Sequence, residues 1–121
     1  MSSVRVQTVQ EFFEAMNKGD LERALANFAP SAKFHTISRS AQAIPLVDGV
    51  ANYRVRRASR PVGEMHYEPG PYFEQKTCVI VKVGGRYTGP AKGDKEFLPI
   101  NLSNVFRFNE DNKIFESWVF E

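Results

Sequence analysis

One stretch late in the sequence, from Phe97 to Phe108, places a single polar side chain within an apolar stripe. Side chains of a β-strand alternate between its two faces. If this stretch is a strand, one face carries Leu98, Ile100, Leu102, Asn104, Phe106 and Phe108. A buried carboxamide without a partner costs about 1–3 kcal/mol, so Asn104 needs a hydrogen-bonding partner. That partner is either a backbone group or buried water of the protein itself, or a small molecule bound in an apolar pocket.

Two side chains are of the type that titrates near neutral pH, His35 and His66. His35 lies in an expected short strand from Ala32 to Ile37, where the expected register points it to the outer face. A register slip of one residue would turn His35 inward, as a general base facing Asn104. His66 is also expected on the outer face, because its two neighbours suit the inner face better. Both histidines are candidate catalytic residues beside Asn104.

Four arginines, Arg54, Arg56, Arg57 and Arg60, fall within seven residues. Such a cluster can hold a phosphate or a carboxylate. A charged cluster on a helix is more often a solvated face, and we interpret the four arginines in that way.

Cys78 is the only cysteine, which excludes an intrachain disulfide and favours a reducing compartment. It lies in an apolar run typical of a buried strand, where a nucleophilic role is not expected. The two histidines and the cysteine are far apart in sequence, and Gly84-Gly85 lacks the spacing of a phosphate-binding loop. We therefore expect neither a metal nor another cofactor.

The composition is that of an ordinary globular domain. The 121 residues fit one domain over residues 1–121, and a net charge of +2 is too small to favour nucleic acid. Ten Phe, four Tyr and one Trp must pack together, line a cavity or cover a partner. No stretch approaches the roughly 18 apolar residues of a membrane span, and residues 1–10 lack a signal-peptide core. We expect a cytoplasmic protein without membrane contact.

The first third of the chain is expected to be helical. A first amphipathic helix is indicated by the spacing of Val6, Val9, Phe12, Phe13 and Met16. Gly19 suits the left-handed position after that helix, and Asp20 suits the N-cap of a second helix that Pro30 ends. A third helix is expected from Asp48 to Ser59.

The second half is expected to consist of strands. Their expected ranges are Met65–Glu68, Tyr72–Gln75, Thr77–Val83, Arg86–Thr88, Phe97–Phe108 and Ile114–Phe120. Gly84-Gly85 is expected to form a hairpin turn, and Gly89 to Lys95 a loop. Helices followed by consecutive strands predict an α+β fold with a mostly antiparallel sheet that curls around the helices.

The outer face of this sheet is a candidate interface. If Ser117 and Val119 point inward, Trp118 lies on the outer face beside Glu116. A large aromatic ring on a half-polar sheet face is a good interface anchor. We expect a homodimer through the outer sheet face that includes Trp118.

Four short segments together resemble a known family: Phe13–Leu21, Phe28–Pro30, Asn104–Asn109 and Lys113–Ile114. They are similar to segments of the NTF2-like superfamily, and within it of the SnoaL-like and ketosteroid-isomerase-like small-molecule proteins. The resemblance covers nearly the whole chain. It implies a cone of three N-terminal helices packed on a strongly curved, mostly antiparallel sheet that encloses an apolar pocket, usually dimeric through its outer face.

The resemblance also implies a site that differs from that of ketosteroid isomerases. Those enzymes use a Tyr on the first helix, an Asp general base on the first strand and a protonated Asp as oxyanion donor. The matching positions hold Phe12, Thr36 and Asn104. An Asn N–H can donate to a developing oxyanion, but Thr36 cannot abstract a proton. Steroid isomerisation by that route is therefore not expected.

Three functions remain open on the sequence. The first is a cofactor-independent isomerase, cyclase or dehydratase (a lyase) that acts on a hydrophobic carbonyl compound by acid–base chemistry. Asn104 would polarise the carbonyl, and His35 or His66 would move the proton. The residues expected to shape the pocket are Phe12, Phe34, Thr36, Leu102, Phe106, Phe108 and Ser117. The alternatives are a non-catalytic binder of an apolar small molecule, favoured by the missing carboxylate, and a dimeric protein-interaction module that uses the outer sheet face.

Overall fold

The computed structural model describes residues 3–37, 44–59, 65–87 and 98–121. Its helices and strands are, in chain order, α1 (Val4–Asn17), α2 (Leu21–Leu25), β1 (Phe28–Ile37), β2 (Val47–Asp48), α3 (Val50–Ser59), β3 (Met65–Glu74), β4 (Cys78–Tyr87), β5 (Leu98–Pro99), β6 (Leu102–Phe108) and β7 (Ile114–Phe120). Helices dominate the first half and strands the second, which confirms the α+β class. Arg60, Phe97 and the expected loop from Gly89 to Lys95 lie outside the described residues.

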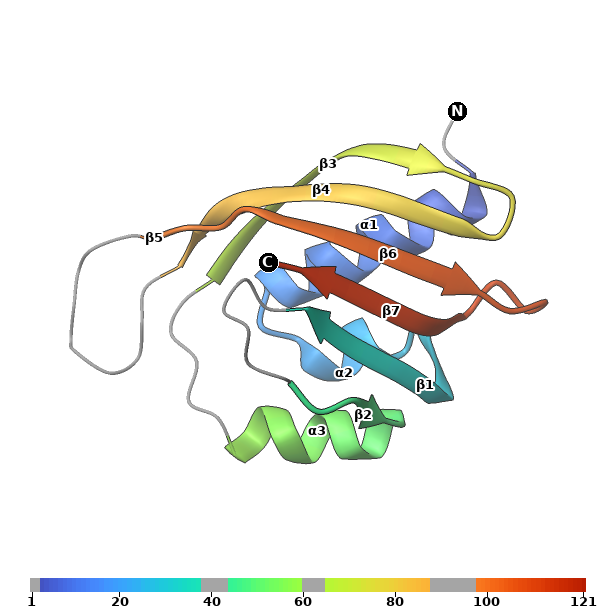
Figure 1. Cartoon of the computed structure of the whole chain (residues 1–121), viewed down its shortest axis with the longest axis horizontal. Coiled ribbons are helices and arrows are strands. Elements are labelled where there is room, and N and C mark those ends of the chain that lie inside the picture. The colour runs from blue at the N-terminus through green and yellow to red at the C-terminus, as the bar shows by residue number, and fades with distance from the viewer. Residues whose placement is uncertain (1–2, 38–43, 60–64, 88–97) are drawn as a thin grey trace.

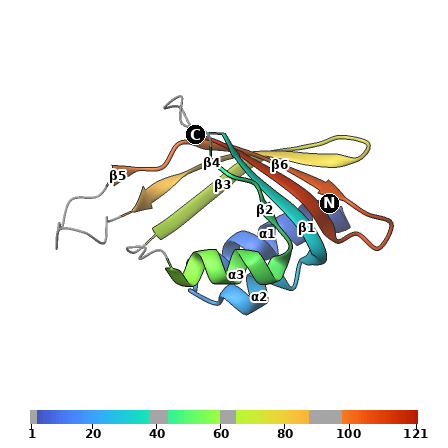
Figure 2. The same cartoon turned by 60° about the horizontal axis from the view of Figure 1, so that its bottom comes forward.

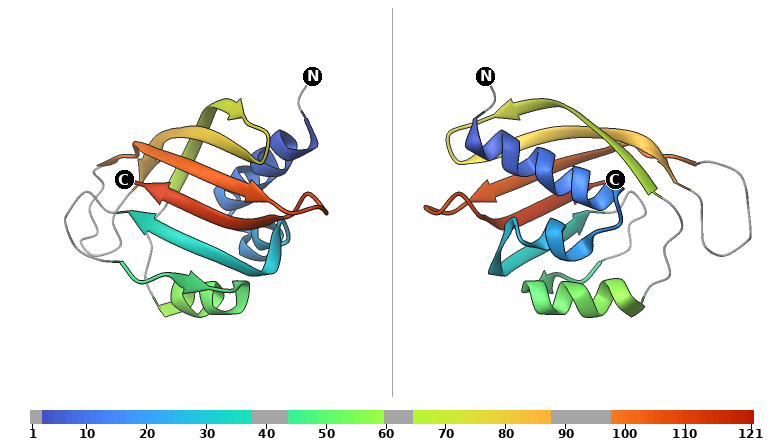
Figure 3. Two further views of the ribbon diagram at one scale, coloured as in Figure 1. Left: turned by 45° about the vertical axis from the view of Figure 1, so that its right-hand side comes forward. Right: turned by 180° about the vertical axis from the view of Figure 1, so that it is seen from behind.

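The strands of the described chain form one sheet in the order β2-β1-β7-β6-β4-β3, with β5 paired to β4 beside this path (Figure 1). Neighbouring strands are antiparallel, apart from the parallel pair β1 and β7. The sheet is curved, and the three helices lie against one of its faces (Figure 2). From behind, α1 crosses that face beneath the edge strand β3 (Figure 3). This is the expected arrangement of helices packed inside a curved, mostly antiparallel sheet.

Local capping interactions mark the start of both N-terminal helices and the end of α1. The Ser3 side chain accepts a hydrogen bond from the backbone N–H of Val6, at 3.1 Å, and caps the start of α1. Gly19 follows α1 with a positive φ of 72°, and the Asp20 carboxylate accepts from the N–H of Arg23 to cap α2. These local signals make α1 and α2 a tight pair that covers the concave face of the sheet.

The core fills the space between the helices and the sheet. Its largest fully buried side chains are Phe106, Ile114, Val9, Val79, Val81 and Val83. Phe12 on α1 packs edge-to-face against Phe13, Phe28 and Phe106, with ring centroids 5.0–5.7 Å apart. Much of the aromatic content of the sequence therefore fixes α1 against the sheet. In the part of the chain that the structure describes, no helix has the length and apolar character needed to cross a membrane.

The expected hairpin turn at Gly84-Gly85 is wrong. β4 runs through both glycines, and Gly84 and Gly85 pair with Glu68 and Tyr67 of β3. Gly85 has a φ of 126°, and a Cβ there would collide with the carbonyl oxygen of His66. The glycines therefore let two strands approach closely at a bend, rather than reverse the chain.

Several expected boundaries are also wrong, because pairing with distant strands decides them. β1 begins at Phe28 rather than Ala32, since Phe28 pairs with Ile114 of β7, and α2 accordingly ends at Leu25 rather than Pro30. The expected third helix begins two residues late, at Val50, because residues 47–48 pair with β1 as β2. The expected strand over residues 97–108 is split into β5 and β6, and the N–H of Ile100 between them donates to the Gly85 carbonyl at 2.9 Å.

The Pro69-Gly70-Pro71 segment changes the register of β3 without ending it. The pairing of β3 with β4 shifts between Pro69 and Tyr72, and the Gly70-Pro71 peptide bond is cis. The two expected strands around this segment are thus one irregular edge strand, with the bend or bulge that the sequence indicated.

Candidate functional site

A cavity of about 490 Å³ lies between the helices and the concave face of the sheet. Its apolar wall includes Phe12, Phe13, Met16, Phe34, Val47 and Leu102. Among the described residues, its polar wall is formed by Thr36, Tyr53, Arg56, Arg57, Tyr67, Asn104 and Glu121. These residues come from α1, α3 and several strands of the sheet, so only the folded chain assembles the cavity.

Asn104 is buried in the cavity wall, with 5% of its surface exposed. It lies on β6 between Val81 of β4 and Val119 of β7, in a register that points its side chain toward the helices. Its Oδ1 atom is buried and has no hydrogen-bond partner among the described residues. An unpaired buried oxygen is uncommon in folded proteins and marks a place where a partner would be gained.

The other expected pocket residues divide into two groups. Phe12, Phe34, Thr36 and Leu102 line the cavity together with Asn104. Phe106, Phe108 and Ser117 are buried but are not among the residues that line it. The helix α1 covers the two phenylalanines, since Phe106 packs against Phe12 and Phe13, and the Arg5 guanidinium lies 5.5 Å from the Phe108 ring centroid.

His35 does not reach the cavity. Its Nε2 atom lies 2.7 Å from a carboxylate oxygen of Glu116, and its ring stacks on Trp118 at a centroid distance of 5.0 Å. Its two neighbours, Phe34 and Thr36, line the cavity. The register slip that would bring His35 to Asn104 is therefore absent, and His35 lies on the outer face of the sheet with Trp118.

His66 is exposed and does not line the cavity either, whereas Met65 and Tyr67 on both sides of it do. Alternation along β3 sends His66 outward. The structure thus places both candidate bases away from Asn104, and a general base cannot be either histidine in this arrangement.

Tyr67 is a titratable cavity residue that was not among the candidates from the sequence. Its ring packs on Phe13 at 5.7 Å, and its hydroxyl donates to the sulfur of Met65 at 3.3 Å. Burial raises the pKa of the Tyr67 hydroxyl, and the positive charge of the neighbouring Arg57 guanidinium opposes that shift in part. The hydroxyl consequently stays protonated at neutral pH and can donate a proton. The alternation along residues 65–67 was the sequence signal that could have identified it.

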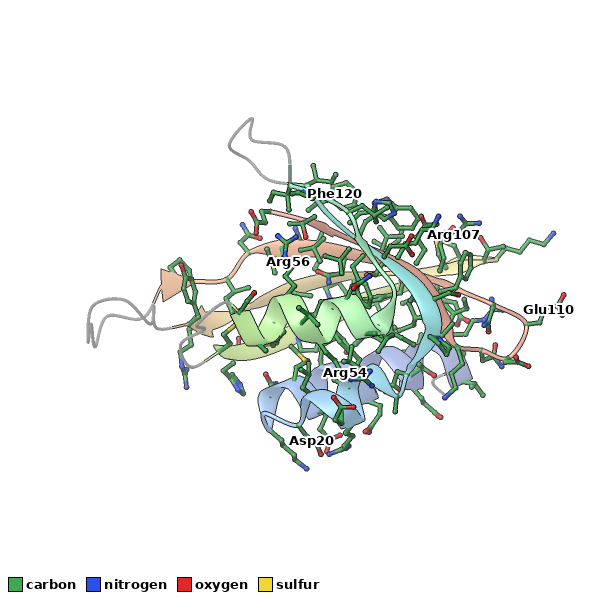
Figure 4. The ribbon with its side chains drawn as sticks, turned by 90° about the horizontal axis from the view of Figure 1, so that it is seen from below. Asp20, Arg54, Arg56, Arg107, Glu110 and Phe120 are labelled. Carbon is green, nitrogen blue, oxygen red and sulfur yellow. The ribbon has the colours of Figure 1, made fainter. Side chains whose placement is uncertain are left out.

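The interpretation of the arginines as a solvated helix face is wrong for Arg56 and Arg57. Both are half-buried and line the cavity. Arg54 is exposed and forms an ion pair with Glu22 of α2 at 2.8 Å. Figure 4 shows Arg54 projecting from α3 toward α2 and Arg56 projecting toward the sheet. Arg56 and Arg57 lie three and four residues after Tyr53, another cavity residue, and this helical spacing was the available signal.

The described residues offer few other reactive groups. Within them, no three His, Cys, Asp or Glu side chains gather in a way that could hold a metal ion. Cys78 is a half-buried free thiol at the start of β4 and is not among the cavity residues. The chemistry that the cavity can support therefore rests on a carboxamide, tyrosine hydroxyls, two guanidinium groups and the Glu121 carboxylate.

Solved structures share this fold over nearly the whole chain. One is the epoxide hydrolase/cyclase-like enzyme SalBIII, described for its role in pyran ring formation in the polyether salinomycin. It is 24% identical to this chain, with a TM-score of 0.81 over 96% of this chain and 88% of that one. An NTF2-like protein of unknown function from Burkholderia pseudomallei K96243 is 20% identical, with a TM-score of 0.80 over 98% and 90%. TerC, co-crystallised with polyporic acid, is 14% identical, with a TM-score of 0.78 over 97% and 90%.

The comparisons also identify the family. No curated protein matches this chain. The family model of the SnoaL-like domain matches residues 9–117, from within α1 to within β7, and this range contains the cavity residues apart from Val119 and Glu121. The chain therefore belongs to the SnoaL-like domain family, and it shares its fold with the NTF2-like protein from Burkholderia pseudomallei.

Proposed function

We propose that this protein binds a hydrophobic carbonyl compound in the cavity and carries out acid–base chemistry on it, of the isomerase, cyclase or dehydratase kind. The observation that carries the proposal is the buried Oδ1 atom of Asn104, which has no partner among the described residues and borders a largely apolar cavity. Supplying a partner to a buried oxygen recovers about 1–3 kcal/mol. A ligand hydroxyl that donates to Oδ1, such as an enol O–H, is therefore favoured over a purely apolar ligand.

A carboxamide suits a carbonyl compound that changes between keto and enol forms. The enol O–H donates to Oδ1, whereas the keto or enolate oxygen accepts from the side-chain N–H. One residue can thus hold the reacting oxygen in both states, and its N–H stabilises negative charge that develops on that oxygen.

Tyr67 is the proposed proton donor, in place of the two histidines. Tyr67 lines the cavity, and its hydroxyl is protonated at neutral pH, as a proton donor must be. Glu121 is the single Asp or Glu among the described residues that line the cavity, and it takes the role of general base in this proposal. The roles of Asn104, Tyr67 and Glu121 require no metal or organic cofactor.

The structural relatives support the class of function. SalBIII is described as epoxide hydrolase/cyclase-like, AclR from Streptomyces galilaeus as a putative hydroxylase, and TerC was crystallised with polyporic acid. These proteins share the fold with this chain at 14–24% identity. Their names favour a small-molecule protein over a protein-interaction module.

The second candidate is a non-catalytic binder that uses the same cavity. The observation that favours it is the lack of a histidine or aspartate in the described cavity wall. Both candidates predict ligand binding at Asn104, and only the enzyme predicts turnover.

A ligand screen with matched variants tests these proposals. Steroid, terpenoid and polyketide-type ketones are each added to the wild type, to Asn104→Leu and to Asn101→Leu, whose side chain is exposed and outside the cavity. A ketone that binds the native state raises the melting temperature of the wild type and of Asn101→Leu, and not that of Asn104→Leu. Equal shifts in all three proteins would contradict the role of Asn104.

Turnover of the same ketones separates the enzyme from the binder. Product formation is followed by mass spectrometry in the wild type and in Tyr67→Phe, which keeps the ring and removes the hydroxyl. If the protein is an enzyme, the wild type should form product, and the rate of product formation should be lower by about 100-fold or more in Tyr67→Phe, which should still bind the ketone. Binding without product in the wild type would instead support the binder.

A further inference from the structure

We infer that the ligand of this cavity carries an oxyanionic group, a carboxylate in the simplest case, which Arg56 and Arg57 bind. The inference rests on the proposed function, in that it assumes a small molecule in the cavity. It adds the chemical class of that molecule: an apolar body with a hydroxyl or carbonyl oxygen at Asn104 and an anion at the two arginines.

The position of the two arginines supports this inference. They are adjacent in the last turns of α3, and both line the cavity. Asn104 belongs to β6, in the sheet that forms the facing wall. A single ligand in the cavity can therefore contact both the carboxamide and a guanidinium group.

The charge balance of the arginines points the same way. Arg23, Arg54 and Arg107 each have a glutamate carboxylate within ion-pair distance. Arg56 and Arg57 have no carboxylate within 4.0 Å among the described residues. The Arg56 Nη1 atom makes only a long hydrogen bond to the Pro45 carbonyl, at 3.4 Å, and Arg57 interacts with the Tyr67 hydroxyl.

Two half-buried cations without a carboxylate partner make the cavity wall electropositive. Glu121 is the single carboxylate among the described lining residues, and its side chain is exposed. A planar guanidinium presents parallel N–H donors that match the two oxygens of a carboxylate. An anion bound here would compensate the positive charge in surroundings that screen it less than bulk water does.

The contact between Arg57 and Tyr67 links the anion site to the proposed chemistry. An anion that binds Arg57 fixes the ligand beside the Tyr67 hydroxyl, while Asn104 holds the ligand oxygen. Binding energy from the anionic group would thus orient the reacting part of the molecule.

A pair of fluorescent probes that differ only in charge tests the inference. 8-Anilinonaphthalene-1-sulfonate carries an anion on an apolar aromatic body, and N-phenyl-1-naphthylamine is the same body without the sulfonate. Their dissociation constants are measured by fluorescence titration at low ionic strength for the wild type, the double variant Arg56→Gln/Arg57→Gln and the control Arg54→Gln. Arg54 is on the same helix but outside the cavity, and it pairs with Glu22. Circular dichroism and urea denaturation are used to check that each variant is folded.

The inference predicts that the double variant binds the sulfonate probe at least about tenfold more weakly, which corresponds to the loss of a charge-assisted hydrogen bond. The neutral probe should bind both proteins equally within about twofold, and Arg54→Gln should match the wild type for both probes. An unchanged affinity of the double variant for the sulfonate probe overturns the inference while leaving the proposed cavity function intact.

A cavity-filling variant shows where the probes bind. Leu102 lines the cavity, so Leu102→Trp should weaken the binding of both probes. If Leu102→Trp leaves both affinities unchanged, neither probe occupies the cavity, and the anion inference and the proposed binding function fail together.

Discussion

The carboxamide of Asn17, the last residue of α1, forms two hydrogen bonds with the backbone of Tyr67 on β3. Its Oδ1 atom accepts from the Tyr67 N–H at 2.7 Å, and its Nδ2 atom donates to the Tyr67 carbonyl at 2.8 Å. β3 is at the end of the strand order, so Asn17 satisfies backbone groups that no further strand of the described sheet pairs. The side chain thereby ties the helix to the sheet edge and holds Tyr67 in the cavity wall.

Asn17→Ala should lower the free energy of unfolding by about 1–3 kcal/mol, because two partly buried backbone groups lose their partners. Urea denaturation measures this change. The control is Asn52→Ala on α3, where the exposed side chain donates one hydrogen bond to the Asp48 carbonyl. That control should stay within about 0.5 kcal/mol of the wild type. Equal effects at the two sites would mean that the Asn17–Tyr67 link adds nothing to stability.

Gly85→Ala should be strongly destabilising and Gly84→Ala should not. A Cβ at Gly85 meets the His66 carbonyl oxygen and sits on a backbone with a φ of 126°, whereas a Cβ at Gly84 has its nearest neighbours at 3.9 Å. Gly85→Ala should therefore lower the free energy of unfolding by about 1–3 kcal/mol or more, through backbone strain and a shift of β3. Thermal or urea denaturation of the two variants measures the difference. Similar stabilities for both would contradict the close approach of β3 and β4 at Gly85.

The Tyr67 hydroxyl should ionise above the ordinary tyrosine pKa of about 10. Burial raises its pKa and Arg57 opposes part of that shift, so Arg57→Gln should raise the Tyr67 pKa further. Absorbance near 295 nm against pH, with Tyr67→Phe subtracted, isolates this residue among the four tyrosines. Arg54→Gln is the control and should leave the titration unchanged.

The same shift predicts how stability changes with pH. The folded state binds the Tyr67 proton more tightly than the unfolded state, so this contribution is fully present below the unfolded pKa of about 10. It is lost as the pH rises through the higher folded pKa. The free energy of unfolding should therefore fall less for Tyr67→Phe than for the wild type on going from pH 9 to pH 11. About equal losses in the two proteins would contradict the raised pKa.

Asn104→Leu should keep the fold and raise the free energy of unfolding of the unliganded protein by about 1–3 kcal/mol, because it removes a buried oxygen without a partner. Urea denaturation without ligand measures this, with Asn101→Leu as the exposed control. A gain in stability together with a loss of ligand binding is the exchange expected at a functional site. If Asn104→Leu unfolds instead, Asn104 is a structural hydrogen-bonding group.

The homodimer through the outer sheet face stays a prediction. Trp118 stacks on His35 on that face, and the side chains of Ile37 and Phe120, which pair with each other between β1 and β7, are 48% and 42% exposed. Trp118→Arg should reduce the sedimentation coefficient from that of a dimer to that of a monomer. Val55→Arg is the control, because Val55 is 68% exposed on α3, away from the sheet face. A wild type that sediments as a monomer would rule out the dimer.

The sequence by itself determined the features that depend on neighbouring residues. Helix periodicity and capping by Asp20 and Gly19 define α1 and α2, and the alternation along residues 102–108 points Asn104 inward. The last strand begins and ends as expected, at Ile114 and Phe120. Backbone preferences and the two-residue period of a strand act over a few residues, so they can be read from the sequence.

Only the tertiary structure decided which side chains meet in the cavity. β1 extends back to Phe28 because it pairs with β7, and β4 continues through Gly85 because β3 and β5 pair with it. Arg57 reaches Tyr67, and neither histidine reaches Asn104, because the curvature and order of the sheet bring distant elements together. A solvated helix face and a cavity wall can share one local sequence pattern, and long-range strand pairing and packing determine which of them forms.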